Sequence, residues 1–515
     1  MNKKTGAITF FGIIILFLLL FGVKFFEGIW SFPSFSLVPF MVVALLGTGI
    51  FTTIYLGFPQ IRYLRHGIKV TRGVYDDPNE AGDLSHFQAL STALSATVGI
   101  GNIAGVATAI YYGGPGALFW MWITAFFGSA LKFAECTLAV EYRDFDKQGM
   151  TAGGPMYTIE RGLGIKWRWL AIIFACFAVI CSFATGNAIQ SFTLSDQIYS
   201  EVTQMVGSEH WLTLKHQLLD NYAVSIQQII NGVLIATISG LVIIGGIKRI
   251  GNVTSYLAPF MAVIYFIAAM LIILANITDI PASFSSIISM AFNPPAAVGG
   301  VAGGTLLVVM NTMLWGVKRG LYSNEAGQGS APIAHSTAKT EFPAREGVVA
   351  LLEPFIDTII ICTLTGLTII VTGTWHHTEF YTTRIDPTFT GELLNGSLLT
   401  SLAFKNGLAW LFPFGDKIIT LGVLLFAIST VISWSFYGDR ATDYLFGEKA
   451  IPVYRSFYIL FVFIGAIASL EAIWAFGDAA LGFMTFPNLI SIILLSPILK
   501  KLTTSYFDIE HQVYK

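Results

Sequence analysis

A succession of long apolar segments constrains this chain more than any other feature. A helix needs about 20 apolar residues to cross the hydrocarbon layer of a bilayer. Segments of this kind occur at 7–30, 37–57, 87–111, 117–140, 169–192, 226–244, 256–274, 301–334, 348–371, 418–437, 454–470 and 472–499. The sequence therefore predicts an all-α polytopic membrane protein with about twelve transmembrane helices.

The composition agrees with exposure to lipid and excludes several other classes. Hydrophobic residues make up 54% of the 515 positions and charged residues 12%, whereas soluble domains carry roughly twice that charged fraction. The net charge of −2 gives no basic surface for nucleic acid. No cofactor motif is visible, and we interpret the four cysteines as small core residues without metal-ligand spacing. These are Cys136, Cys176, Cys181 and Cys362.

The basic residues predict the orientation of the bundle. With the N-terminus in the cytoplasm and alternating spans, 21 of the 29 Lys and Arg residues fall inside, five fall outside and three fall within the segments. This asymmetry follows the positive-inside rule. We therefore expect a bacterial inner-membrane protein with both termini cytoplasmic. The apolar run after Lys3 and Lys4 is long and lacks a cleavage motif, so we expect an uncleaved first helix rather than a signal peptide.

Two helices precede an internal repeat. We place these two helices at 1–58, a first set of five helices at 86–276, a second set at 297–499 and a cytoplasmic tail at 500–515. Because five is an odd number, the two sets begin on opposite sides of the membrane, which is the signature of an inverted repeat. The polar segments at 194–222 and 373–416 are expected outside, and 281–295 is expected to form a short helix over the outer mouth.

The first span of each set contains a glycine-rich interruption. The first is VGIGNIA at 98–104 and the second is AGQGSAP at 326–332. A helix that unwinds at membrane depth frees backbone groups, which are tolerated only beside a cavity, a ligand or protein partners. The freed N–H groups suit a carboxylate, and the freed C=O groups suit Na⁺ or an ammonium group. The two matching interruptions together predict a site for an amino acid and a cation. Taken alone, Gly101 and Gly105 also match a helix-packing motif.

Ionisable residues within apolar segments are functional candidates by default. Lys132 and Glu135 are three residues apart and are predicted to pair on one helix. The other candidates are Lys318, Arg319, Glu325, Glu353 and Asp357, together with His335, which is expected at the cytoplasmic end of a helix. The sequence leaves open whether these groups serve transport or only hold helices together.

Several motifs carry a resemblance to a known family. They are GIGNIAG at 99–105, GGPG at 113–116, GGPMY at 153–157, WGVKRG at 315–320 and SNEAG at 323–327. Together they resemble the alanine or glycine:cation symporters, also called sodium:alanine symporters, over nearly the whole chain after Val38. The resemblance implies the LeuT-type fold of five plus five inverted helices. It also implies import of a small neutral amino acid with Na⁺ by alternating access, and no enzymatic activity.

The resemblance further implies roles for single residues. Backbone groups of Ile100 and Gly101 would hold the substrate carboxylate, although Ile100 stands where the family pattern has Thr. The remaining substrate contacts would be Gln190, Tyr322 as an aromatic wall, Thr430 as a hydroxyl contact and Trp434 as a lid. One Na⁺ site would comprise Val98, Ser429 and Thr430, and a weaker second site would comprise Thr97 and Asn102.

Three alternatives remain open at this point. The carrier could be coupled to H⁺, although hydroxyl and carbonyl oxygens favour Na⁺, or it could prefer glutamine. A channel is a less favoured alternative, because a two-fold repeat within one chain is typical of alternating access. The sequence does not indicate an oligomeric state.

Overall fold

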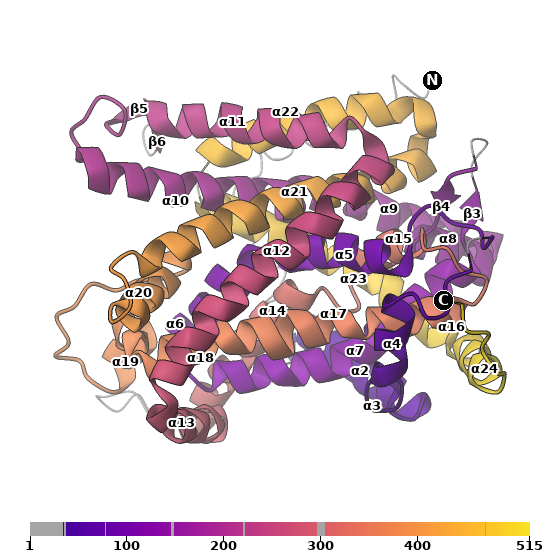
Figure 1. Ribbon diagram of the computed structural model, residues 1–515, viewed down its shortest axis with the longest axis horizontal. Coiled ribbons are helices and arrows are strands. Elements are labelled where there is room, and N and C mark those ends of the chain that lie inside the picture. Colours follow the sequence, from indigo (N-terminus) through magenta and orange to yellow (C-terminus); the bar gives the residue numbers. More distant parts are fainter. Residues whose placement is uncertain are drawn as a thin grey trace.

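The computed structural model describes residues 34–35, 38–77, 79–145, 149–219, 222–295, 304–468 and 470–514 of the chain (Figure 1). Nearly all of this part is helical. Its three sheets are two-stranded antiparallel hairpins. They are formed by β1 (Ser34–Phe35) with β2 (Val38–Pro39), β3 (Asp144–Phe145) with β4 (Thr151–Ala152), and β5 (Lys215–Leu219) with β6 (Tyr222–Ser225).

The helices follow one another closely along the chain. The first half contains α2 (Phe40–Tyr55), α3 (Pro59–Arg62), α4 (Leu64–Thr71), α5 (His86–Thr97), η1 (Gly101–Gly105), α6 (Val106–Gly113), α7 (Ala117–Glu141), α8 (Pro155–Tyr157), η2 (Thr158–Gly162), η3 (Ile165–Trp167), α9 (Arg168–Phe183), η4 (Ala184–Ala188), α10 (Ile189–Val206), α11 (Ile226–Ile243) and α12 (Gly246–Ala275). The second half contains η5 (Ile277–Asp279), α13 (Ile280–Phe292), α14 (Gly304–Asn324), α15 (Ala331–His335), α16 (Pro343–Ala350), α17 (Leu352–Pro354), η6 (Phe355–Cys362), α18 (Thr363–Val371), η7 (Thr374–His377), α19 (Glu379–Arg384), α20 (Ser397–Leu408), α21 (Gly415–Phe446), η8 (Glu448–Ala450), α22 (Ile451–Ile467), α23 (Leu470–Leu494) and α24 (Ser496–Phe507).

Membrane-spanning helices dominate the described residues, which confirms the predicted all-α polytopic class. Seven helical runs are long and apolar enough to cross a bilayer, and the number rises to nine if each of two bent pairs counts as one span. The predicted span at 7–30 lies outside the described residues. The predicted span at 37–57 corresponds to α2, whose 16 residues are shorter than that segment.

Two segments that were expected to be loops are partly helical, and one predicted boundary falls inside a helix. Helix α10 continues to Val206, so much of the expected external loop at 194–222 is helical. The segment at 373–416 contains α19 and α20, and 281–295 contains the expected short helix, α13. At the C-terminus the chain bends by 63° between α23 and α24, and α24 continues to Phe507. The boundary predicted at residue 499 therefore falls inside a helix.

Glycine allows α7 to pack closely against its two main neighbours, α14 and α16. A Cβ atom on Gly316 would lie 2.3 Å from the carbonyl oxygen of Ala117, and one on Gly347 would lie 2.0 Å from Oγ1 of Thr137. Small residues allow this approach, because lipid provides no hydrophobic force that drives helices together. Elsewhere α12 and α21 flank α5, and α11 packs along α22 (Figure 1).

A chain of buried ionisable side chains connects α7 to α5 through α15, α16 and α17. Lys132 on α7 donates to Glu353 over 3.1 Å, and the second oxygen of Glu353 lies 2.7 Å from Nε2 of His335. Nδ1 of His335 lies 2.5 Å from Glu346, whose other oxygen contacts His86 on α5. All five side chains are at most 1% exposed. This ionic network joins helices that are far apart in the sequence.

The network corrects one prediction. Lys132 pairs with Glu353 and not with Glu135, which accepts hydrogen bonds from the backbone N–H of Gly329 and from the amide of Asn488. His335 does end a helix, as expected, but it is fully buried between two carboxylates. For Lys132, a partner 221 residues away in the chain is thus closer in space than the acid one helical turn away.

We predict that Lys132→Met destabilises the protein by about 3–5 kcal/mol, because it leaves a buried carboxylate with too little compensation. Adding Glu353→Gln removes that charge and should restore part of the loss. Unfolding of the purified protein by SDS in mixed micelles measures both. Lys405→Met, at an exposed position on α20, is the control. Equal stability of Lys132→Met and Lys405→Met would contradict the assigned role of the network.

Candidate functional site

The first predicted interruption is a break between α5 and η1. The two helices differ in direction by 51° across Val98, Gly99 and Ile100. The N–H of Gly99 donates to Oδ1 of Asn102 over 3.0 Å, and the N–H of Ile100 donates to Oε1 of Gln190 over 3.4 Å. Side chains therefore replace the lost helical hydrogen bonds, as burial requires.

The second predicted interruption separates α14 from α15. Gly327 and Gly329 have φ angles of +79° and +84°, and Glu325 has a φ of +52°, so three residues of this segment are left-handed. Glycine adopts this conformation at little cost, whereas Glu does so rarely. The backbone groups find partners in side chains of neighbouring helices: Asn488 donates to the carbonyl of Gly327, and Glu135 accepts from the N–H of Gly329.

A third irregularity, which the sequence reasoning missed, lies between α9 and α10. The π-helical turn η4 brings Gly186 against Trp434, where a Cβ atom would lie 2.2 Å from the Cβ and Cγ atoms of the tryptophan. The amide of Gln190 donates to the carbonyl of Thr185 over 3.2 Å and so closes the turn. The run of Thr185, Gly186 and Asn187, two polar residues and a glycine within an apolar segment, is the signal that could have revealed this irregularity.

The structure brings most predicted substrate residues together where these three breaks meet. Gln190 reaches the N–H of Ile100, and a Cβ atom on Gly101 would lie 3.2 Å from Cδ1 of Tyr322. A Cβ atom on Gly99 would lie 2.7 Å from Oγ1 of Thr430. All of these residues are buried. Backbone donors, an amide, a hydroxyl and an aromatic ring therefore surround one small region.

Trp434 lies beside this region and is also fully buried. Its indole N–H donates to Oε1 of Glu325 over 3.1 Å, and Oε2 of Glu325 accepts from the hydroxyl of Ser330 over 2.5 Å. With its left-handed backbone conformation, Glu325 thus directs its carboxylate toward Trp434 on α21. This contact joins Trp434 on α21 to the segment of the second break.

The first predicted cation site is rich in oxygen atoms. The hydroxyl of Thr430 lies 3.0 Å from the carbonyl oxygen of Ser95, and the hydroxyl of Ser429 lies 3.4 Å from the same oxygen and 2.9 Å from the carbonyl of Phe426. Sequence reasoning missed Ser95 and Phe426, whose contributions come from the backbone. Each precedes a predicted residue, Val98 or Ser429, by three positions on its helix, so helical geometry could have suggested them.

The second predicted cation site is rearranged in the structure. The hydroxyl of Thr97 bonds to its own helix, at the carbonyls of Ala93 and Leu94. The amide of Asn102 donates instead to the buried carboxylate of Asp357 over 2.6 Å.

Two hydroxyls complete this second cluster. Those of Ser323 and Thr358 each donate to the other carboxylate oxygen of Asp357 over 2.7 Å. In the part of the chain that the structure describes, no basic side chain hydrogen-bonds to this carboxylate. Asp357, to which the sequence assigned no role, is therefore the centre of a polar cluster beside both breaks.

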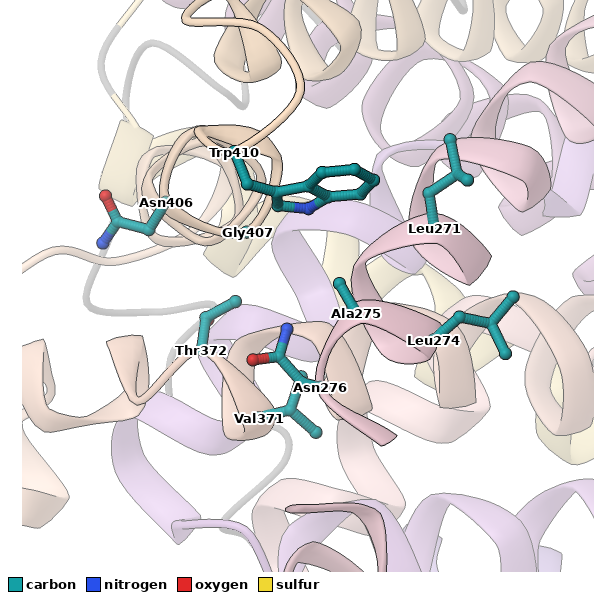
Figure 2. Close-up of a pocket in the computed structure, with 9 residues that line it drawn as sticks. All are labelled: Leu271, Leu274, Ala275, Asn276, Val371, Thr372, Asn406, Gly407 and Trp410. Atoms are coloured by element: carbon teal, nitrogen blue, oxygen red, sulfur yellow. The ribbon is translucent and has the colours of Figure 1, made fainter. Parts of the chain in front are cut away.

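The cavities described in the structure lie around this region rather than in it. A cavity of about 280 Å³ beside the C-terminal half of α6 is lined by Tyr112, Asp196, Trp315, Arg319 and Ser397, among others. Another, of about 760 Å³, lies between the ends of α12 and α18 and the helix α20, with Trp410 across it (Figure 2). Neither is lined by Gln190, Tyr322, Thr430 or Trp434. We therefore locate the site by the convergence of polar groups and not by cavity volume.

The comparison with known proteins decides the family. The model of the sodium:alanine symporter family matches residues 25–515. The chain belongs to this family. A sodium:alanine symporter family member is a membrane transporter and not an enzyme, which confirms the sequence-based resemblance.

The sequence identity to individual relatives differs from one to another. The chain is 43% identical to the sodium/alanine symporter AgcS of Methanococcus maripaludis, over 92% of this chain and 96% of AgcS. It is 33% identical to GlnT of Bacillus subtilis, named a probable sodium/glutamine symporter, over 89% of this chain and 86% of GlnT. The crystal structure of MhsT with L-phenylalanine matches 82% of this chain and 100% of MhsT, with 13% identity and a TM-score of 0.46, which is too low to carry an argument.

We predict that Gly186→Ala disrupts the contact between η4 and Trp434. The added methyl group overlaps the indole, and overpacking of this kind costs about 1–3 kcal/mol. Thermal unfolding and substrate uptake of the variant should both decline. Gly47→Ala is the matched control, because its Cβ atom would meet nothing within 4 Å. If both variants behave like the natural protein, the close packing at η4 is not required.

Proposed function

We propose that this protein is a sodium-coupled symporter that imports a small neutral amino acid, alanine or glycine, by alternating access. The observation that carries the proposal is the meeting of two broken helices beside two clusters of oxygen ligands. Broken helices at membrane depth provide backbone donors and acceptors at the same point. A zwitterion with an accompanying cation uses both kinds of group. We further propose a location in a bacterial inner membrane, with both termini cytoplasmic.

The break after α5 suits the substrate carboxylate. The segment from η1 into α6 begins at Gly101, so its N-terminal N–H groups and helix dipole favour an anion. Gln190 Oε1 already accepts from Ile100 at 3.4 Å, a long contact that a carboxylate oxygen can replace. The amide of Gln190 can then turn to the bound amino acid.

The two oxygen clusters suit Na⁺, which travels with the substrate as cargo. Ser95, Phe426, Ser429 and Thr430 offer two carbonyls and two hydroxyls. We propose the carbonyl of Val98 as a fifth oxygen ligand. Hard cations prefer ligands of this type. The carboxylate of Asp357 offers a second position with a full negative charge, and Asn102 and Ser323 stand beside it. A charge buried in this way needs a counter-ion, which Na⁺ provides.

The aromatic residues favour a short side chain on the substrate. Tyr322 and Trp434 are both large and buried, and Gly186 already fills the space behind the indole. Alanine and glycine fit this arrangement better than glutamine does. Because the chain is similar to GlnT, a carrier that prefers glutamine is the second candidate for the substrate. For the coupling ion, the alternative to Na⁺ is H⁺.

Uptake into proteoliposomes tests the proposal directly. We expect accumulation of labelled alanine only with an inward Na⁺ gradient, and no accumulation when choline replaces Na⁺. Uptake that survives choline but stops when the proton gradient collapses would support the proton-coupled alternative. Flux that never saturates with substrate would indicate a channel.

Thr430→Val should weaken Na⁺ binding, because valine keeps the shape of threonine but offers no oxygen ligand. We expect the Na⁺ concentration for half-maximal uptake to rise about tenfold, which corresponds to about 1.4 kcal/mol. Thr237→Val is the matched control, since its hydroxyl is exposed and bonds only to its own helix. An unchanged Na⁺ dependence in Thr430→Val would remove Thr430 from the ion site.

Trp434→Ala should change which amino acids compete for uptake. Removing the indole opens space for several carbon atoms, so we expect weaker alanine transport, by about tenfold, and new inhibition by leucine or glutamine. Competition assays with glycine, alanine, leucine and glutamine measure the change. Trp410→Ala, at a position that is 61% exposed, is the control. A profile that stays the same in Trp434→Ala places the pocket wall elsewhere.

A further inference from the structure

An apolar groove lies beside α5 and adjoins the proposed ion site, since Val98 and Met261 belong to its lining. Its cavity of about 500 Å³ opens between α4, α5, α12 and η6. Phe87 and Leu94 line it from α5, and Val98 lines it from the break that follows α5. Met261, Phe355 and Ile356 line it from the other helices. Figure 1 shows α12 crossing α5, and α4 lies below the right-hand end of α5. The predicted orientation places this end at the cytoplasmic face.

The groove is open toward the surroundings of the bundle. Phe87 is 44% exposed and Phe355 is 36% exposed, although both are large apolar side chains. On a membrane protein, exposed apolar surface at this depth contacts acyl chains. The polar groups in the lining are few, and none of the lining residues is acidic. This chemistry suits a hydrocarbon chain and does not suit a second amino acid.

The mouth of the groove carries positive charge from α4. Gly67 and Val70 of this short helix are buried, and a Cβ atom on Gly67 would lie 2.2 Å from the carbonyl oxygen of Val348, so α4 lies directly on α16. Arg65, Lys69 and Arg72 form an exposed stripe at a spacing of four and three residues, and Arg72 itself lines the groove.

These three cations are available to a ligand. Among the described residues, no ion pair involves any of them. Burial lowers the pKa of the neighbouring His66 to about 4, so at neutral pH the charge of α4 comes from Arg and Lys alone. A helix with a basic stripe and a buried opposite face is typical of the surface of an anionic leaflet.

From this juxtaposition we propose that the groove binds one anionic glycerophospholipid of the cytoplasmic leaflet. Its phosphate contacts Arg72 at the mouth, and one acyl chain lies in the groove along α5. The charge selects an anionic headgroup over phosphatidylcholine, and the apolar lining selects a lipid over a soluble phosphate. Since α5 leads directly into Val98 beside the proposed ion site, the lipid contacts one half of the first broken helix.

Lipid retention measured by native mass spectrometry tests this proposal without reference to transport. The full-length protein is released from detergent in the presence of phosphatidylglycerol or phosphatidylcholine. We expect one phosphatidylglycerol to remain bound preferentially, and Arg72→Gln to lower its retention about fivefold, the factor for one basic residue near an anionic lipid. Retention of phosphatidylcholine should not change.

Two further variants separate a site from general charge attraction. Lys166→Gln removes an exposed cation on the same predicted face, away from α4, and should leave retention unchanged. Ala262→Phe fills the groove from α12 and should lower retention as much as Arg72→Gln does, while Ala262→Ser should not. Gel filtration confirms that each variant is folded.

Three outcomes would overturn the proposal. One is equal loss in Lys166→Gln and Arg72→Gln, which indicates attraction to the whole basic surface. The second is full retention in Ala262→Phe, which places the lipid elsewhere. The third is displacement of the lipid by glycerol phosphate alone at equal concentration, which indicates a site for a soluble anion.

Discussion

The compensation of buried charge is the constraint on which the rest of this structure depends. Lys132, Glu353, His335, Glu346 and His86 share their charges along one continuous chain of contacts, with each carboxylate held by two partners. A single buried ion pair is weak evidence for stability, because desolvation offsets much of the attraction. Here every member has a partner on another helix, so separating any helix exposes an unpaired charge. The helices joined in this way are therefore expected to move as one body.

The same requirement for partners explains how the helices can break at membrane depth. Unwound backbone in the hydrocarbon region is tolerated only where its polar groups are satisfied. Asn102 and Gln190 serve the first break, and Glu135 and Asn488 serve the second. The side chains that stabilise the first break, Asn102 and Gln190, are thus among those that surround the proposed substrate and ion sites. Stability and function use the same polar atoms in this region.

Much of the fold could be predicted because membrane helices leave a strong local signal. Apolar length predicted the spans, and two glycine-rich runs predicted both principal breaks. The boundary at residue 499 and the loop at 194 were misplaced, because polar residues at a helix end do not stop the helix from continuing beyond the apolar window.

The site was less predictable, because its contacts join distant parts of the chain. Ile100, Gly101, Gln190, Tyr322 and Thr430 were proposed as substrate contacts from the family resemblance, and they lie close together in the structure. Periodicity alone could not have paired them. Ser95 and Phe426 contribute carbonyl oxygens, which every residue has, so their side chains gave no signal. Asp357 was visible as a charge in the membrane, but its position beside Asn102 and Ser323 depends on tertiary structure.

The pairing of Lys132 with Glu353 has a consequence for synthesis of the protein. The two residues are separated by 221 positions. A ribosome that adds roughly 5–20 residues per second needs roughly 10–45 seconds to cover that distance. During this interval α7 must enter the membrane with a cation whose final partner does not yet exist. Glu135, one helical turn away, is the acid then at hand, and we expect it to compensate Lys132 until Glu353 arrives.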